Sequence, residues 1–137
     1  MSAFKEVILI TAGDPASIST EITIKAVESQ RVNKNINLVA ITDTSLVEEY
    51  KQLINSNIKI NEIKDLIKFS DYKDHYLNII SIKLNNKVEY GKPDINNFSF
   101  TKFSIIKTVE IHNNSIASAI VTNPINKYIM YKSGFNF

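Results

Sequence analysis

Two short loops carry the residues whose types and spacing best suit chemistry. The first places Gly13, Asp14 and Pro15 directly after an apolar run. Glycine permits an unusual backbone angle or the close approach of a ligand, and proline stiffens the turn. The Asp14 carboxylate would lie beside a helix N-terminus, where it could hold a hydroxyl group or a ribose. The alternative is that Asp14 only caps the turn, because Asp and Gly are common in turns.

The second loop places Thr122, Asn123, Pro124 and Lys127 after another apolar run. We expect Thr122 or Asn123 to cap a helix and Pro124 to be its first residue, which puts Lys127 in the first turn. A cation there is unfavourable by about 0.3–1 kcal/mol at an exposed site. Beside free backbone N–H groups it would suit an anion such as a phosphate ester, so Lys127, Asn123 and Thr122 are candidates for substrate binding. The alternative is a solvated surface lysine.

Other residue types give weaker indications of chemistry. The chain has no cysteine, which excludes disulfides, thiolate nucleophiles and cysteine-ligated metal sites. His75 and His112 lack the short spacing of a metal motif, so neither is assigned a role. An aromatic stripe is interpreted as core or interface, not as a platform for stacked bases; its members are Phe98, Phe100 and Phe103.

Composition narrows the class of protein. The 137 residues include 16 Lys and Arg against 14 Asp and Glu, for a net charge of +2, and Arg31 is the only arginine. The basic residues are scattered, which argues against nucleic-acid binding. The apolar run that ends at Ile10 is too short for a signal-peptide core or a membrane span. We therefore expect a cytoplasmic protein that binds neither nucleic acid nor a membrane.

The elements that must position the two loops follow from the apolar patterns. We expect strands at residues 7–11, 36–42, 76–84 and 115–121. We expect helices after the first loop, around residues 46–54, over residues 98–112, and from the second loop through Tyr131 to Gly134. Residues 58–75 suggest a short extended stretch and a turn, and residues 85–97 a loop of turn-forming residues.

Alternation of strands and helices predicts the fold class and the place of the loops. It indicates an α/β protein with a mostly parallel sheet and flanking helices. The first helix is expected to be capped by Ser17 or Ser19. Ligands of such sheets collect beyond the carboxyl ends of the strands. Since each loop follows a strand, we expect both loops at one ligand-binding edge.

At these loops the sequence resembles the 4-hydroxythreonine-4-phosphate dehydrogenase (PdxA) family of vitamin B6 biosynthesis. The family's first motif, of the type Gly-Glu-Pro-Ala-Gly-Ile-Gly-Pro-Glu, is similar to residues 13–21. Its later pattern, Thr-(Gly/Ala/Asn)-Pro-(Ile/Val)-(Asn/His)-Lys before a Gly-rich turn, is similar to residues 122–127 and Gly134.

The chain also departs from the family pattern. Ser17, Ser19 and Thr20 stand where the family usually has two glycines and a proline, and Asn97 stands where a glycine is common. The chain ends before the family's Thr-Gly-His-Thr-Glu segment and lacks the later histidines that hold a metal. The resemblance therefore places no catalytic residue and no metal ligand in this chain, which is expected to be inactive alone.

The resemblance implies an isocitrate/isopropylmalate dehydrogenase-like fold that is incomplete here. Residues 1–137 would be the N-terminal part of a two-domain dehydrogenase, with the second domain and the rest of the first absent. The whole enzyme would be a homodimer that uses NAD or NADP and a divalent metal ion. Its reaction would be oxidation and decarboxylation of 4-phosphooxy-L-threonine, on the route to pyridoxal phosphate.

Two other functions remain open at this stage. A related dehydrogenase of phosphorylated threonate or erythronate would share both loops. A non-catalytic α/β remnant could instead bind a phosphorylated ligand or a partner subunit without turning anything over.

Overall fold

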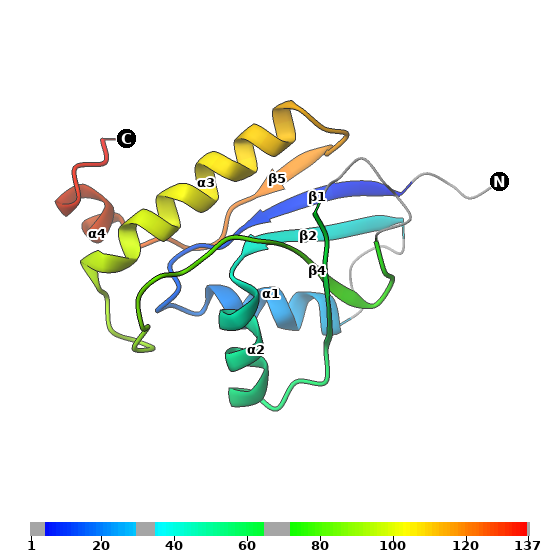
Figure 1. Ribbon diagram of the computed structural model, residues 1–137, viewed down its shortest axis with the longest axis horizontal. Helices are drawn as coiled ribbons and strands as arrows, with labels where there is room; N and C mark the ends of the chain where they lie inside the picture. Colours follow the sequence, from blue (N-terminus) through cyan, green and yellow to red (C-terminus); the bar gives the residue numbers. More distant parts are fainter. Residues whose placement is uncertain (1–4, 30–34, 65–71, 137) are drawn as a thin grey trace.

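A single parallel sheet organises the chain. The structure, a computed structural model, describes residues 5–29, 35–64 and 72–136. Five strands lie in the order β3-β4-β2-β1-β5, and every neighbouring pair is parallel (Figure 1). The strands are β1 (Glu6–Thr11), β2 (Ile36–Thr42), β3 (Lys59–Glu62), β4 (Tyr76–Ser81) and β5 (Ala119–Val121). The predicted α/β class with a parallel sheet is confirmed.

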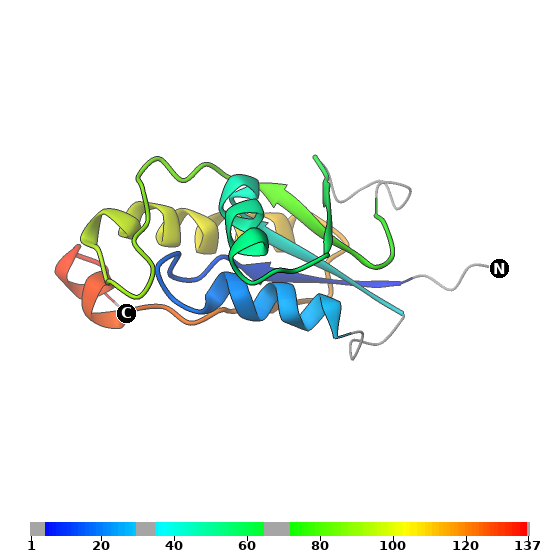
Figure 2. The same cartoon turned by 90° about the horizontal axis from the view of Figure 1, so that it is seen from below.

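Helices cover both faces of the sheet, as Figure 2 shows for α1 and α3. The helical elements are α1 (Ser19–Glu28), α2 (Thr44–Leu53), the short 3-10 helix η2 (Ile95–Asn97), α3 (Phe98–Asn113) and α4 (Lys127–Lys132). Ile24 of α1 and Val47 of α2 share one buried cluster with Leu77 of β4. Phe100 of α3 shares the other with Leu9 of β1. The central strands are therefore buried on both faces, which explains their continuous apolar runs.

The side chains of α3 that face the sheet are small and carry hydroxyl groups. Thr101, Ser104 and Thr108 are almost fully buried, whereas Phe103 is 51% exposed. The Ser104 hydroxyl donates to the carbonyl of Ile41 and accepts from the amide of Ala12, both at 2.8 Å. Small side chains let the helix approach the sheet closely.

The aromatic stripe predicted on this helix is only partly buried. Phe100 lies in the core, Phe98 is half-buried and Phe103 faces outward. Phe100 confirms the core alternative, whereas Phe103 lies outside the core because the hydroxyl residues of α3 take the face against the sheet. An interface role for Phe103 stays a prediction.

Several predicted boundaries need correction. The predicted strand at 76–84 ends at Ser81, because the Leu84 amide turns to donate to the Asp43 carboxylate at 2.7 Å. The predicted strand at 115–121 is regular only from Ala119, since the Ser115 hydroxyl accepts from the Ala117 amide. The extended stretch predicted within 58–75 is β3, and residues 65–71 lie outside the described ranges.

The N-cap residues of α1 and α4 differ from those predicted. The N-cap residue of α1 is Ile18, whose side chain makes no cap hydrogen bond, and the Ser17 hydroxyl accepts from the Ser19 amide at 3.2 Å. Ser19 instead donates its hydroxyl to the Pro124 carbonyl at 3.0 Å. The cap of α4 is Asn126, whose side chain accepts from the Ile129 amide at 3.2 Å. Contacts between the loops thus displaced the caps that local sequence favours.

Candidate functional site

The two loops meet at one edge of the sheet, as predicted. β1 and β5 are parallel neighbours, with Ile10 opposite Val121 (Figure 1). The segments that leave their carboxyl ends therefore start side by side. Residues more than 100 positions apart in sequence come into contact there, such as Thr11 and Asn123.

The Pro124 carbonyl joins the second loop to the first. It accepts a hydrogen bond from the Asp14 amide at 2.9 Å and from the Ser19 hydroxyl at 3.0 Å. Pro124 therefore contributes to the contact between the loops. It was predicted to be the first residue of the helix, but it lies before α4.

Asn123 makes a second set of bonds between the loops. Its amide nitrogen donates to the Thr11 carbonyl at 2.9 Å and to the Thr23 hydroxyl at 2.8 Å. Its backbone N–H donates to the Thr11 hydroxyl at 3.0 Å. The donors of Asn123 are thus engaged inside the protein, so this side chain holds the loops together.

Gly13 lies where the loops approach most closely. Its φ of +71° is unfavourable for other residues. A Cβ atom there would lie 2.4 Å from the Ser19 hydroxyl, 2.7 Å from the Pro124 carbonyl oxygen and 2.8 Å from the Asn123 Cβ. Two of these three neighbours belong to the second loop, so Gly13 is what allows the loops to touch.

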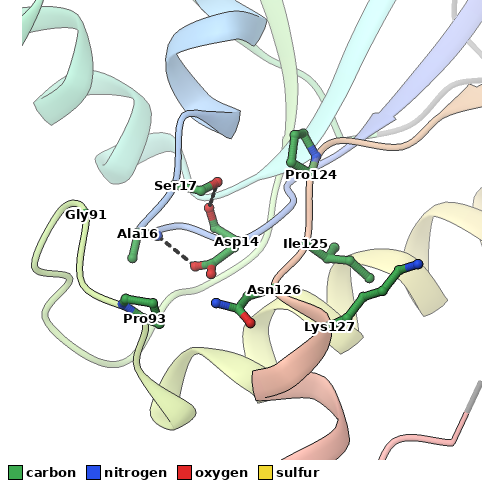
Figure 3. Close-up of a pocket in the computed structure, with 9 residues that line it drawn as sticks. All are labelled: Asp14, Ala16, Ser17, Gly91, Pro93, Pro124, Ile125, Asn126 and Lys127. Carbon is green, nitrogen blue, oxygen red and sulfur yellow. Dashed lines mark hydrogen bonds between the residues drawn. The ribbon is translucent and has the colours of Figure 1, made fainter.

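A cavity of about 530 Å³ opens beside the joined loops (Figure 3). Its walls come from the first loop, the second loop and the segment between β4 and η2. The lining residues are Asp14, Ala16, Ser17, Gly91, Pro93, Pro124, Ile125, Asn126 and Lys127. It lies at the carboxyl edge of the sheet, the usual place for ligands of this architecture.

The segment between β4 and η2 is attached to the first loop and to α2. The Gly91 amide donates to the Ala16 carbonyl at 2.7 Å. The Tyr50 hydroxyl donates to the Ser17 carbonyl at 3.0 Å, and the Tyr50 and Tyr90 rings pack edge-to-face with centroids 4.4 Å apart. Burial, with a smaller contribution from the Glu21 carboxylate, raises the pKa of Tyr50. These contacts keep the third wall of the cavity in place.

Two of the six predicted site residues line this cavity. Asp14 is only 7% exposed and accepts from the Ala16 amide at 2.9 Å. Lys127 is exposed, and its side chain extends away from Asp14 (Figure 3). The four others belong to the two loops but are not among the lining residues; they are Gly13, Pro15, Thr122 and Asn123.

Seven of the nine lining residues were not among the predicted site residues, and three of them show why. Asn126 lies between the singled-out residues Pro124 and Lys127, and its type and position match a helix cap. For Gly91 and Pro93, the sequence indicated only that they belong to a loop of turn-forming residues. Nothing local indicates that their segment crosses the sheet edge to reach the first loop.

Within the described ranges, no group of three or more His, Cys, Asp or Glu side chains could hold a metal ion. These residues therefore do not fit the divalent metal that the resemblance implies, and no chemical step here is assigned to one. Among the same residues, no helix is long and apolar enough to cross a membrane.

Comparison with known proteins gives the same family from several directions. Residues 34–137 match the family described as "Pyridoxal phosphate biosynthetic protein PdxA". The chain is 30% identical over 132 residues to a Fusobacterium nucleatum protein named "Putative D-threonate 4-phosphate dehydrogenase", covering 95% of this chain and 40% of that protein. It is 29% identical over 137 residues to the 4-hydroxythreonine-4-phosphate dehydrogenase of Maricaulis maris, covering 95% and 39%. The chain thus spans about 40% of the length of these curated relatives.

Solved structures share the fold. A structure from Salmonella typhimurium described as a "putative 4-hydroxythreonine-4-phosphate dehydrogenase" superposes with a TM-score of 0.83 at 23% identity, over 97% of this chain and 41% of that one. A 4-hydroxythreonine-4-phosphate dehydrogenase from Burkholderia phymatum gives 0.84 at 23% identity, over 96% and 40%. The sheet and its flanking helices are therefore those of this class of dehydrogenase structure.

Proposed function

The chain belongs to the pyridoxal phosphate biosynthetic protein PdxA family, and we propose that it is the N-terminal part of a two-domain dehydrogenase of a phosphorylated hydroxy acid. The observation that carries this proposal is the cavity beside the two joined loops, whose lining includes both Asp14 and Lys127. A ligand with both an anionic group and alcohol groups matches that combination.

The first candidate substrate is 4-phosphooxy-L-threonine, oxidised and decarboxylated on the route to pyridoxal phosphate. Similarity to the Maricaulis maris protein and the family match support it. The second candidate is D-threonate 4-phosphate, which the names of the Fusobacterium nucleatum and Clostridium botulinum relatives favour, each at 30% identity. Both substrates are phosphorylated four-carbon acids, so they could use the same pair of loops.

The proposed roles within this chain are those of ligand binding. Lys127 attracts the phosphate, and the exposed Thr122 lies on the same loop. Asn123 acts indirectly, because its donors hold the loops together. Gly13 and Pro15 shape the first loop. NAD or NADP as hydride acceptor, the divalent metal, the second domain, a homodimer and a cytoplasmic location belong to the proposal for the whole enzyme.

Calorimetric titration of the chain with D-threonate 4-phosphate, 4-phosphooxy-L-threonine and unphosphorylated D-threonate tests the phosphate role. Lys127→Ala should weaken binding of both phosphorylated ligands by about tenfold or more, because a charge-assisted bond is lost. It should leave the unphosphorylated acid unaffected. Lys132→Ala, at the last residue of the same helix, is the matched control and should leave the affinity for all three ligands unchanged. Equal affinity of wild type and Lys127→Ala for the phosphorylated ligands would remove Lys127 from the site.

A further inference from the structure

Asp14 and Asp43 are both buried but differ in how many hydrogen bonds their carboxylates accept. Asp14 and Asp43 are 7% and 8% exposed, and each lies in the loop after a central strand. The two carboxylate oxygens of Asp43 together accept three backbone N–H groups at 2.7–3.1 Å. Only one oxygen of Asp14 has a donor among the described residues, the Ala16 amide at 2.9 Å. The hydrogen-bonding capacity of Asp14 is therefore incomplete.

The incomplete carboxylate lies on the cavity wall (Figure 3). No ion pair to Asp14 occurs in the described part of the chain. A carboxylate can accept about four hydrogen bonds, so a largely buried one with a single protein donor keeps free accepting capacity where it faces the cavity. An oxygen in this state is suited to accept a hydrogen bond from a group inside the cavity.

The side chain of Asn126 supplies a hydrogen-bond donor in the same cavity lining. Its side-chain oxygen accepts from the Ile129 amide, which fixes the orientation of the amide group. The amide nitrogen is turned toward the Asp14 carboxylate on the cavity wall (Figure 3). Among the described residues this nitrogen has no acceptor, and no hydrogen bond joins it to Asp14. Among the described residues, the cavity lining therefore includes a carboxylate oxygen without a donor and an amide nitrogen without an acceptor.

A cavity lined by both an acceptor, the Asp14 carboxylate, and a donor, the Asn126 amide, suits the alcohol group of a ligand. A hydroxyl group donates one hydrogen bond and accepts others, so it satisfies both partners. A phosphate oxygen would be repelled by the carboxylate, and an ammonium group would leave the Asn126 amide unmet. We propose that Asp14 and Asn126 together bind an alcohol group of the phosphorylated ligand, with the hydroxyl donating to Asp14 and accepting from Asn126. This inference rests on the proposed function and adds which two side chains of this chain hold the alcohol group of the ligand.

The test compares two ligands that differ only in their hydroxyl groups. D-threonate 4-phosphate carries two secondary alcohols, and 4-phosphooxybutanoate has the same carbon chain and phosphate without them. Calorimetric titration should give the wild-type chain an affinity about tenfold or more higher for the hydroxylated ligand. Asp14→Asn retains an oxygen for the Ala16 amide but replaces the free acceptor, so it should lower that preference to near unity.

Further variants separate ligand recognition from folding. Asn126→Asp keeps the acceptor for the Ile129 amide but removes the free donor, so it should also abolish the preference. Asp43→Asn, equally buried but with both carboxylate oxygens engaged, should leave the ratio of the two affinities unchanged. Lys127→Ala should weaken both ligands equally and leave the same ratio.

The outcomes distinguish the inference from the proposed function. Wild-type chain that binds both ligands equally would overturn the hydroxyl pair and leave the phosphate proposal standing. Folded wild-type chain, judged by circular dichroism, that binds neither ligand would overturn the proposed function and the inference with it. A preference that survives both Asp14→Asn and Asn126→Asp would place the hydroxyl contact elsewhere.

Discussion

Gly13 determines how closely the two loops of the cavity approach each other. Its backbone has a positive φ, and its α-carbon faces the Ser19 hydroxyl and the Pro124 carbonyl. Gly91 also has a positive φ, of +82°, but a Cβ atom there would meet nothing within 4 Å. The two glycines therefore separate the effect of backbone strain from the effect of contact between the loops.

Gly13→Ala should lower the free energy of unfolding by about 2–4 kcal/mol, because backbone strain and a steric clash add. Gly91→Ala should cost about 1 kcal/mol, the strain alone. Urea denaturation of both variants and the wild type measures the difference. Equal losses would mean that the loops separate freely and that Gly13 is needed only for its backbone angle.

At the scale of elements, Tyr50 connects α2 to the first loop and to the segment that forms the third wall. Its hydroxyl donates to the Ser17 carbonyl, and its ring packs against Tyr90. Burial first, and then the Glu21 carboxylate, raise the pKa of Tyr50 above its ordinary value of 10.0. The raised pKa means that the folded state resists ionisation of this phenol.

Tyr50 therefore contributes stability below pH 10 that is lost as the pH rises above the unfolded value. Tyr50→Phe should cost about 1 kcal/mol at neutral pH, since one hydrogen bond is lost. It should also make the fall in stability above pH 10 shallower than in the wild type. Urea denaturation at pH 7 and between pH 9 and 11 checks both effects.

Tyr128→Phe, at an exposed residue of α4, is the neutral-pH control and should change stability by less than about 0.5 kcal/mol. A parallel fall in wild type and Tyr50→Phe would contradict the role of Tyr50.

Over the whole molecule, one sheet joins two separate cores. Leu9 is fully buried on the face covered by α3, and Leu77 is fully buried on the face covered by α1 and α2. Because both side chains come from strands of the same sheet, neither core can form without the backbone that holds the other. The described chain should therefore unfold as one unit.

Leu9→Ala and Leu77→Ala should each lower the free energy of unfolding by about 2–5 kcal/mol, since each leaves a cavity in a packed core. Both variants should keep a single transition in thermal denaturation, seen alike by circular dichroism and tyrosine fluorescence. Leu53→Ala is the control, because Leu53 is 60% exposed, and it should change stability by less than about 0.5 kcal/mol. Two separate transitions in either core variant would show that the faces unfold independently.

Much of the architecture was readable in the sequence because it depends on local patterns. Strands buried on both faces read as continuous apolar runs, which predicted β1 and β2 closely. The parallel alternation predicted that both loops share an edge, and motif spacing predicted the family. The orientation of α3 was harder to predict, because hydroxyl side chains such as Ser104 occupy its buried face and apolar periodicity does not detect them.

The sequence by itself determined the fold class, the family and the two loops, because each depends on residues close together in the chain. Tertiary structure alone decided which side chains of those loops face a ligand. Asn123 and Pro124 bond to a loop about 110 residues away, so Asn126 caps α4 instead. Those bonds also leave both the Asp14 carboxylate and the Asn126 amide in the lining of the same cavity. Such pairings depend on strand neighbours and approach distances, which a single sequence does not encode locally.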